Sequence, residues 1–261
     1  LLRSGFRVRC AEVPGIDDEP GGLYDALDGA QAAALPMPAL TQNGRIRSQR
    51  SDGISLDAIM QSVPAGAVIF GGGLSRVRAA LEAHALRVFD YLDDEALTVA
   101  NAVPSAEGAL EIAMRELPIT LHGSRCLVVG YGRIGKALSA RLHALHARVT
   151  VSARKPADRA AIESAGLRAD RTGSYLHDLA QYDCIFNTVP APVLREEHLR
   201  ALRPDCLLID LASGSGGLAE NAPPALHYIH ALGLPGRCAP KTAAEALKTM
   251  ILRTLAEQEA V

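Results

Sequence analysis

The chain has 261 residues, of which 48% are hydrophobic and 21% charged, and its formal net charge is −2. This length suggests one or two domains, and the near balance of charge argues against the strongly basic class of nucleic-acid binders. No apolar run reaches the roughly 18 residues that a membrane span needs, and no signal peptide is visible. We therefore expect a cytoplasmic protein that has neither nucleic acid nor a membrane as a partner.

The five cysteines form no CxxC pair and join no Cys/His cluster. This pattern indicates buried, reduced thiols and predicts no metal site. The chain opens with LLRSGFRVRCAE, without a Met, which reads as the end of a helix running into a strand. We expect one further βα element to precede it.

The N-terminal part of the chain has a loose α/β pattern. Short segments of apolar residues predict four strands, at 6–12, 34–40, 66–71 and 86–92. Residues 74–85 have the apolar spacing of a helix, and the long segment 104–123 predicts a second helix that joins this part to the rest.

In the C-terminal part, apolar strands alternate with amphipathic helices. The strands are predicted at 126–130, 148–153, 184–189, 206–212 and 227–232. The helices are predicted at 133–147, 156–166, 195–202 and 240–258. Most of these strands are apolar throughout, which indicates a parallel sheet that is covered on both faces.

The segment CLVVGYGRIGKAL, residues 126–138, places Gly-Tyr-Gly-Arg-Ile-Gly between a strand and a helix. Gly130 permits the tight turn, Gly132 lets the backbone approach a pyrophosphate, and Gly135 allows the helix to pack close to the strand. The helix N-terminus offers N–H groups and a positive dipole end to phosphate oxygens. We therefore predict a dinucleotide site that also includes Tyr131, Arg133 and Ile134, with Arg133 placed to reach a phosphate.

These patterns predict an α/β fold with two doubly wound parallel-sheet (Rossmann-like) lobes joined by long helices. We expect an N-terminal substrate lobe over 1–103, a connecting helix over 104–123 and a dinucleotide-binding domain over 124–238. The final segment, 239–261, is expected to be a helix. Packing of this helix on the first lobe and packing on a second subunit both remain open.

The end of the second strand of this domain selects the dinucleotide. NAD enzymes place Asp or Glu there to accept hydrogen bonds from the ribose hydroxyls. Here Ser152, Arg154 and Lys155 occupy that position. Because cationic side chains pair with a 2′-phosphate, we predict NADP (NADPH) as the cofactor and consider NAD the weaker candidate.

Two further loops follow apolar strands and are expected to line the same crevice, because ligands bind outside the carboxyl ends of parallel strands. Thr188, Val189 and Pro190 follow one strand, and Leu211 and Ala212 follow the next. We predict that these residues contact the ribose and the nicotinamide.

Several stretches together resemble one family. These stretches are NAVPSAEGALEIAM (101–114), residues 119–154, IFNTVPAPVL (185–194), LLIDLASGSGG (207–217) and LGLPGRCAPKTAAEAL (232–247). In this order they are similar to the A subunit of dipicolinate synthase. The family shares its two-lobed architecture with D-2-hydroxyacid dehydrogenases and S-adenosylhomocysteine hydrolases.

The resemblance implies an NADP-dependent oxidoreductase of endospore-forming bacteria, which oxidises a dihydrodipicolinate-type ring to dipicolinate. It also implies a partner, the flavoprotein-like B subunit, while a homo-oligomer remains open. Two other readings stay open at this point. One is a D-2-hydroxyacid or amino-acid dehydrogenase of the same architecture, and the other is a non-catalytic NADP-sensing subunit.

A dicarboxylate substrate needs hydrogen-bond donors, and helix N-termini supply them. We predict substrate contacts at Gly72 and Gly73 in a glycine loop, at Ser105 at the start of the connecting helix, and at Lys241 and Thr242 at the start of the last helix. Glu107 and Lys241 are the predicted catalytic residues, with Glu107 as the group that could orient the substrate or exchange a proton.

Overall fold

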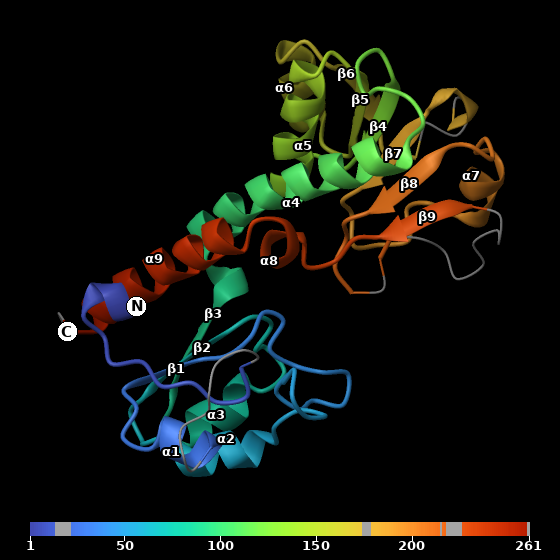
Figure 1. Ribbon diagram of the computed structural model, residues 1–261. Helices are drawn as coiled ribbons and strands as arrows, with labels where there is room; N and C mark the ends of the chain where they lie inside the picture. The colour runs from blue at the N-terminus through green and yellow to red at the C-terminus, as the bar shows by residue number, and fades with distance from the viewer. Residues whose placement is uncertain (14–21, 174–178, 215, 218–225, 260–261) are drawn as a thin grey trace. The chain divides into compact units, whose positions relative to one another are not determined.

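The computed structural model describes residues 1–13, 22–173, 179–214, 216–217 and 226–259 (Figure 1). The chain divides into two compact units: unit 1 is Leu1–Thr98 with Leu247–Val261, and unit 2 is Val99–Ala246. Each unit has its own sheet, and every strand pair in both sheets is parallel. The predicted α/β class with two parallel sheets is confirmed.

Unit 1 is built on a three-stranded sheet of order β1-β2-β3. Its strands are β1 (Ala32–Ala34), β2 (Val68–Gly71) and β3 (Arg87–Asp90). Its short helices are η1 (Leu2–Ser4), α1 (Leu23–Leu27), α2 (Leu56–Ser62), α3 (Arg78–Ala83) and η2 (Tyr91–Asp93). Leu27, Ile59 and Leu81 of α1, α2 and α3 pack with Ile69 and Val88 of the sheet in one apolar cluster.

Two strands predicted in this part are wrong. Residues 6–12 belong to no helix or strand. The segment 34–40 contributes only its first residue, Ala34, to a strand. Pro36 and Pro38 explain the early end of β1, because proline has no N–H group to donate to the ladder.

Unit 2 contains a six-stranded sheet of order β6-β5-β4-β7-β8-β9. Its strands are β4 (Arg125–Val129), β5 (Arg148–Ala153), β6 (Arg168–Arg171), β7 (Cys184–Asn187), β8 (Leu207–Asp210) and β9 (His227–His230). Its helices are α5 (Arg133–Ala144), α6 (Pro156–Ser164), η4 (Leu179–Gln181), α7 (Glu196–Arg200) and α8 (Leu234–Cys238). The strand order reverses between β4 and β7, and in sheets of this type ligands bind at the carboxyl ends of the strands beside that point.

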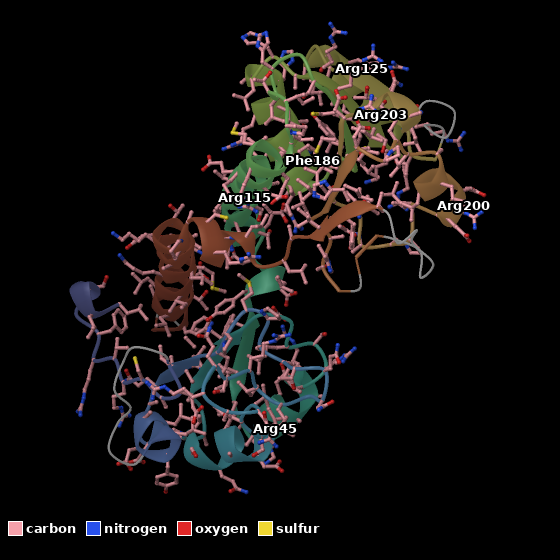
Figure 2. The ribbon with its side chains drawn as sticks, turned by 45° about the vertical axis from the view of Figure 1, so that its right-hand side comes forward. Arg45, Arg115, Arg125, Phe186, Arg200 and Arg203 are labelled. Carbon is pink, nitrogen blue, oxygen red and sulfur yellow. The ribbon has the colours of Figure 1, made fainter. Side chains whose placement is uncertain are left out.

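Both faces of this sheet are buried, as the apolar strands predict. On one face, Ala109 of α4 (Glu95–Glu116), Leu138 of α5 and Ile162 of α6 pack against a cluster that includes the fully buried Phe186 (Figures 1 and 2). On the other face, Leu179 of η4 and Leu199 of α7 join the cluster of Leu127, Val129 and Ile185.

Helix α4 (Glu95–Glu116) begins earlier than the predicted segment 104–123. Its true start carries a capping contact, because Asp94 Oδ1 accepts a hydrogen bond from Leu97 N at 2.7 Å. Pro104 instead lies inside the helix. The prediction placed the start at Pro104 because proline is common in the first helical turn.

The last helix, α9 (Pro240–Glu259), contributes residues to both units. Within unit 1, the Arg253 guanidinium forms an ion pair with Asp94, and Arg87 Nη1 donates to Gln258 Oε1 at 2.9 Å. Ile251 and Thr254 are buried. The final turns of α9 are therefore part of the unit 1 structure.

The five cysteines are free thiols, and three of them are inaccessible. Cys126, Cys184 and Cys206 are fully buried in unit 2, whereas Cys10 is half-buried and Cys238 is exposed. Burial raises the pKa of the Cys126 thiol to about 11 and that of Cys206 to about 12, and it raises the pKa of Cys184 well above its usual range.

Candidate functional site

Two of the three glycines in the loop between β4 and α5, Gly130 and Gly135, are required by close packing or by backbone conformation. Gly130 has φ +101°, and a Cβ there would lie 2.5 Å from Thr188 Oγ1. A Cβ on Gly135 would lie 2.2 Å from the Gly130 carbonyl oxygen. A Cβ on Gly132 would meet no atom within 4 Å, so this side of the loop is open. The loop therefore has the geometry of a backbone surface on which a pyrophosphate can lie.

In the described part of the chain, no side chain caps the N-terminus of α5. The first backbone hydrogen bond of the helix joins Lys136 N to Gly132 O at 2.9 Å. The N–H groups of Ile134 and Gly135 come before it and have no acceptor among the residues that the structure describes. Arg133 is the exposed first residue of the helix, and the half-buried Tyr131 ring lies 5.4 Å from Lys136 Nζ. This helix end can accept an anion.

At the end of β5, two of the three predicted residues are accessible. Arg154 and Lys155 are exposed, and Arg159 Nη1 donates to the Arg154 carbonyl oxygen at 2.8 Å, which adds a third cation at this turn. Ser152 is different, because it is 0% exposed and its Oγ has no hydrogen-bond partner among the residues that the structure describes. The predicted role of Ser152 in cofactor binding stays a prediction.

The loop after β7 packs directly on the glycine loop. The backbone N–H and the hydroxyl of Thr188 both donate to the Val129 carbonyl oxygen, each at 2.9 Å. Val189 is half-buried and Pro190 is exposed. After β8, Leu211 N donates to Asn187 O at 2.8 Å, and both Leu211 and Ala212 are buried. These loops thus lie at the carboxyl edge of the sheet beside the glycine loop.

A buried polar network, which the sequence interpretation missed, holds these two loops together. Asp210 at the end of β8 and Asn187 at the end of β7 are both 0% exposed, and Asn187 Nδ2 donates to Asp210 Oδ1 at 2.8 Å. Asp210 also accepts hydrogen bonds from Ala212 N at 3.0 Å and Gly217 N at 2.7 Å. Asn187 bonds to both the N–H and the carbonyl oxygen of Val189 at 3.1 Å. The only sequence signal is a polar residue at the end of each apolar strand.

Strand β9 adds two side chains to this edge. Tyr228 OH lies 3.4 Å from Asp210 Oδ2, and burial followed by the Asp210 charge raises the pKa of Tyr228 to about 12. His230 stacks on Tyr228, with a ring centroid distance of 6.3 Å, and its Nε2 lies 3.0 Å from the Ala212 carbonyl oxygen. The tyrosine therefore stays protonated at neutral pH and can donate to the carboxylate.

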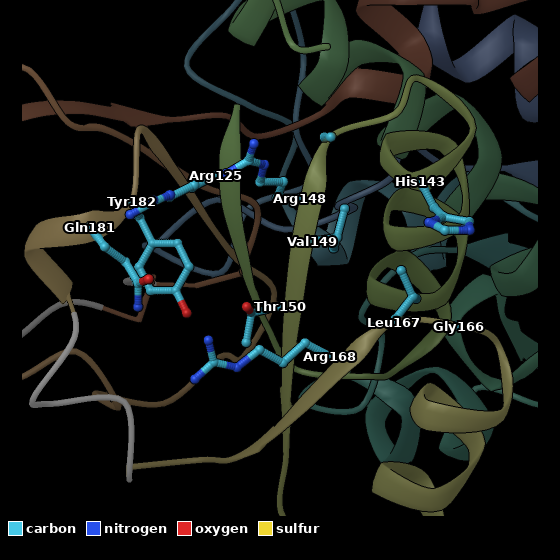
Figure 3. Close-up of a pocket in the computed structure, with 11 residues that line it drawn as sticks. Arg125, His143, Arg148, Val149, Thr150, Gly166, Leu167, Arg168, Gln181 and Tyr182 are labelled. Atoms are coloured by element: carbon cyan, nitrogen blue, oxygen red, sulfur yellow. The ribbon is translucent and has the colours of Figure 1, made fainter. Parts of the chain in front are cut away.

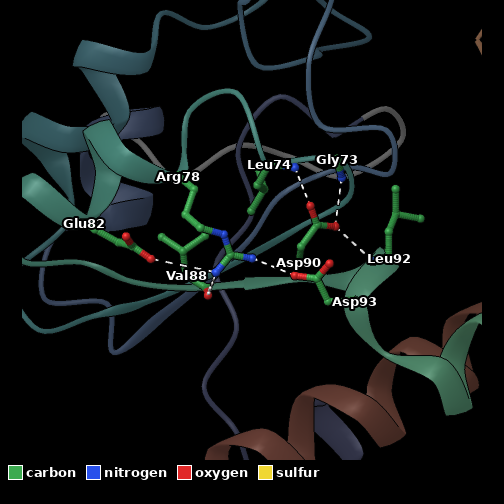
Figure 4. A network of polar contacts seen from close by, with 8 residues as sticks. All are labelled: Gly73, Leu74, Arg78, Glu82, Val88, Asp90, Leu92 and Asp93. Carbon is green, nitrogen blue, oxygen red and sulfur yellow. Dashed lines mark hydrogen bonds and ion pairs between the residues drawn. The ribbon is translucent and has the colours of Figure 1, made fainter.

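The predicted glycine loop of unit 1 already holds an internal carboxylate (Figure 4). Asp90, 6% exposed, accepts hydrogen bonds from Gly73 N at 2.9 Å and Leu74 N at 2.6 Å. Gly72 N donates to Pro36 O at 3.1 Å. The structure therefore corrects the prediction that the amides of Gly72 and Gly73 receive a substrate carboxylate, because these donors are occupied.

Ser105 and Glu107 lie within α4 rather than at its start. The Ser105 hydroxyl is buried and donates to Asn101 O at 2.8 Å, one turn earlier, so the predicted role at a helix start is wrong. The Glu107 carboxylate is exposed and forms an ion pair with Arg141 of α5 at 3.3 Å. The catalytic role of Glu107 stays a prediction.

Lys241 and Thr242 do occupy a helix start. Both are exposed in the first turn of α9, whose first internal hydrogen bond joins Ala243 N to Ala239 O at 3.0 Å. Their backbone N–H groups come before that bond, and no acceptor for them lies in the described part of the chain. The first turn of α9 therefore combines amide donors with an ammonium group.

Within the described ranges, no group of three or more His, Cys, Asp or Glu side chains could hold a metal ion. Among the described helices, none has the length and apolar character to cross a membrane.

Comparison with known proteins agrees with this geometry. Residues 102–219 match the family model described as "D-isomer specific 2-hydroxyacid dehydrogenase, NAD binding domain". The fold and the glycine loop thus define an NAD(P)-binding α/β protein of the dehydrogenase type.

The whole chain defines the family more narrowly. It is 31% identical to the A subunit of dipicolinate synthase from Bacillus subtilis (strain 168) over 271 residues, which cover 99% of this chain and 86% of that protein. The chain belongs to the family of dipicolinate synthase A subunits.

Solved structures show the same fold. The A subunit of Bacillus subtilis dipicolinate synthase matches with a TM-score of 0.79 at 29% identity, covering 97% of this chain and 83% of that one. The A subunit of the Bacillus halodurans enzyme matches with a TM-score of 0.82 at 24% identity, over 94% and 88% of the two chains. A transhydrogenase from Sinorhizobium meliloti shares the fold with a TM-score of 0.69 at 18% identity, over 90% and 77%.

Proposed function

We propose that this chain binds NADP on the loop of residues 130–135 and oxidises a dihydrodipicolinate-type cyclic dicarboxylate to dipicolinate during endospore formation. The observation that carries the proposal is the combination of family membership over 99% of the chain with an open, uncapped glycine loop at the carboxyl edge of the sheet. The nicotinamide would supply the hydride acceptor. In this oxidation the ring loses one hydride and one proton and becomes aromatic.

The preference for NADP is supported by charge at the end of β5. Arg154, Lys155 and Arg159 lie at this turn, where NAD enzymes place an acidic residue. Asp170 is the register partner of Ser152 on the neighbouring strand, but its Oδ1 accepts a hydrogen bond from Arg171 N at 2.7 Å, within its own strand. A 2′-phosphate would be attracted to the three cationic side chains at this turn.

For the substrate we propose that the first turn of α9 binds one ring carboxylate through Lys241 and Thr242. An ammonium group at a helix start opposes the helix dipole, so its presence favours a binding role. We retain Glu107 as the candidate proton acceptor. Its carboxylate is exposed on α4 and forms an ion pair with Arg141.

The proposal of a partner protein rests on family membership alone. We propose a cytoplasmic location and, as the partner, a flavoprotein-like B subunit.

The decisive experiment measures thermal stabilisation of the purified chain by NADP, NADPH, NAD and dipicolinate, followed by turnover assays. A ligand at 100 times its Kd stabilises the native state by about 2.7 kcal/mol, so preferences are resolved directly. We expect NADP to stabilise more than NAD, and NADPH to form from NADP and fresh dihydrodipicolinate. Stabilisation without turnover, with or without the partner, would support the alternative of a sensing subunit. Oxidation of a D-2-hydroxyacid instead would support the dehydrogenase alternative.

The roles of Glu107 and Arg141 can then be separated by substitution. If Glu107 exchanges the proton, Glu107→Gln lowers kcat by about 100-fold or more. Arg141→Gln removes the ion-pair partner but leaves the carboxylate, and we expect kcat to stay within about threefold. Equal, small effects of both changes would reduce Glu107 to a surface ion pair.

A further inference from the structure

A second cationic region lies at the amino edge of the unit 2 sheet, at the opposite ends of the strands from the glycine loop. A cavity of about 430 Å³ is lined there by Arg125, Arg148 and Arg168, together with Thr150, Gln181 and Tyr182. Figure 3 shows these side chains around the starts of β4, β5 and β6. The described residues that line the cavity include no Asp or Glu.

Strand register places the three arginines on one face of the sheet. Arg125 is paired with Arg148, and Arg168 is paired with Thr150. Neighbouring residues in register point to the same side, and residues two apart on one strand do so as well. Arg125, Arg148 and Arg168 therefore share the face that also carries Tyr182 in its apolar cluster. The guanidinium groups of Arg125 and Arg148, which are register neighbours, repel one another unless an anion lies between them.

The carboxylate of Asp183, which lies near the cavity, already has hydrogen-bond donors other than the cavity guanidinium groups. Asp183 Oδ1 accepts a hydrogen bond from the Arg203 guanidinium at 2.8 Å, and Asp183 Oδ2 accepts one from the Arg125 backbone N–H at 2.7 Å. Within the described residues, no carboxylate pairs with the guanidinium groups of Arg125 and Arg148. The side-chain amide nitrogen of Gln181 is buried and has no acceptor among the residues that the structure describes. The cavity thus presents two uncompensated guanidinium groups and an unsatisfied donor.

From this arrangement we propose that the amino edge of the unit 2 sheet is a second anion site, which binds a compact oxyanion with two or more negative charges through Arg125, Arg148 and Arg168. Guanidinium groups bind phosphoryl and carboxylate oxygens in bidentate geometry. The cavity volume suits a small ligand of this class rather than an extended polymer. Along the six residues of β5, at about 3.3 Å per residue, this site lies about 16 Å from the end that carries Arg154.

The test is isothermal titration of the whole chain with inorganic pyrophosphate and with malonate, at constant ionic strength set by chloride. Each titration is made with and without saturating NADP, because the glycine loop also binds phosphate. We expect one equivalent of at least one of these anions to bind while NADP is present. The two probes separate a phosphoryl ligand from a dicarboxylate ligand, and failure of both would overturn the proposal.

Substitutions locate the binding. We expect Arg148→Gln to weaken the Kd at least tenfold, and Arg125→Gln with Arg148→Gln to abolish binding. The matched control is Arg200→Gln, because this side chain is 72% exposed on α7 and pairs with Glu196. We expect its Kd to stay within twofold. Melting temperatures and NADP affinity verify that the variants are folded. Equal anion affinity in all variants would overturn the proposal, and so would loss of anion binding when NADP is added.

Discussion

Replacement by alanine has different consequences at two glycines of the 130–135 loop, Gly132 and Gly135. At Gly132 the backbone is extended, with φ −79° and ψ −163°, and any residue adopts it. At Gly135 the new methyl group would collide with the Gly130 carbonyl oxygen. The two positions therefore separate ligand binding from folding.

We predict that Gly132→Ala leaves the melting temperature of the free protein unchanged but weakens the dinucleotide Kd tenfold or more. Gly135→Ala should cost about 2 kcal/mol of stability as well, because the helix must shift away from the loop. Gly236→Ala is the control, since its Cβ meets nothing within 4 Å. Calorimetry and dinucleotide titration measure both effects, and unchanged dinucleotide affinity in Gly132→Ala would contradict the placement of the pyrophosphate.

Arg154 tests the choice of dinucleotide. Arg154→Gln should weaken NADP binding about tenfold, which corresponds to the loss of one charge-assisted hydrogen bond, and should leave NAD binding within twofold. The measurement is the Kd of the Arg154→Gln variant for NADP and for NAD. Exposed Arg171, on the neighbouring strand β6, provides a charge-matched control through Arg171→Gln. Parallel losses for NADP and NAD would show that Arg154 does not read the 2′-phosphate.

At the scale of the elements, the apolar runs are sufficient to predict β4, β5, β7 and β8, because strands buried on both faces need continuous hydrophobic sequence. Strand β6 (Arg168–Arg171) was not predicted, because it lies at the edge of the sheet and its sequence, RADR, is polar. The predicted start of α4 is wrong, because Pro104 lies inside the helix although proline is typical of a first helical turn.

The candidate site is predicted in the same uneven way. The glycine loop is local in sequence, so its geometry follows from a short motif. The network of Asn187, Asp210 and Tyr228 joins three strands that are separated along the chain. No spacing rule connects such residues, and only the register of the sheet brings them together.

We predict that Asp210→Asn destabilises unit 2 by about 3 kcal/mol and weakens dinucleotide binding. The amide would place a donor against the N–H groups of Ala212 or Gly217, and an unsatisfied buried donor is costly. Asp205→Asn is the control, because this carboxylate is 73% exposed and its ion pair with Arg203 should contribute less than about 1 kcal/mol. Urea unfolding measures the difference, and equal stability of both variants would refute the positioning role of Asp210.

In unit 1 the corresponding element is the loop held by Asp90. Asp90→Asn should cost about 2 kcal/mol, because Asp90 accepts from Gly73 N, Leu74 N and Leu92 N. Asp93→Asn, at a carboxylate 73% exposed, should cost less than about 1 kcal/mol. Hydrogen exchange at residues 68–74 reports the change, and unaltered protection in Asp90→Asn would contradict it.

At the scale of the whole molecule, α9 makes the C-terminus a part of unit 1. We predict that truncation after Ala246 makes the amides of unit 1 exchange rapidly, because unit 1 loses Ile251, Thr254 and the Arg253–Asp94 ion pair. Unit 2 loses none of these groups, so its glycine loop should still bind the dinucleotide. A full-length Arg253→Gln variant should show a much smaller loss of protection. Equal protection of unit 1 with and without residues 247–261 would be the contrary result.

The distribution of thiols gives this protein a natural pair of labelling positions. Thiol reagents attack the thiolate, so Cys126, Cys184 and Cys206, buried and with raised pKa values, will react slowly. The two remaining cysteines, Cys10 and Cys238, lie one in each unit. A donor and an acceptor dye attached to them would report any movement of one unit against the other by energy transfer, without a single engineered residue.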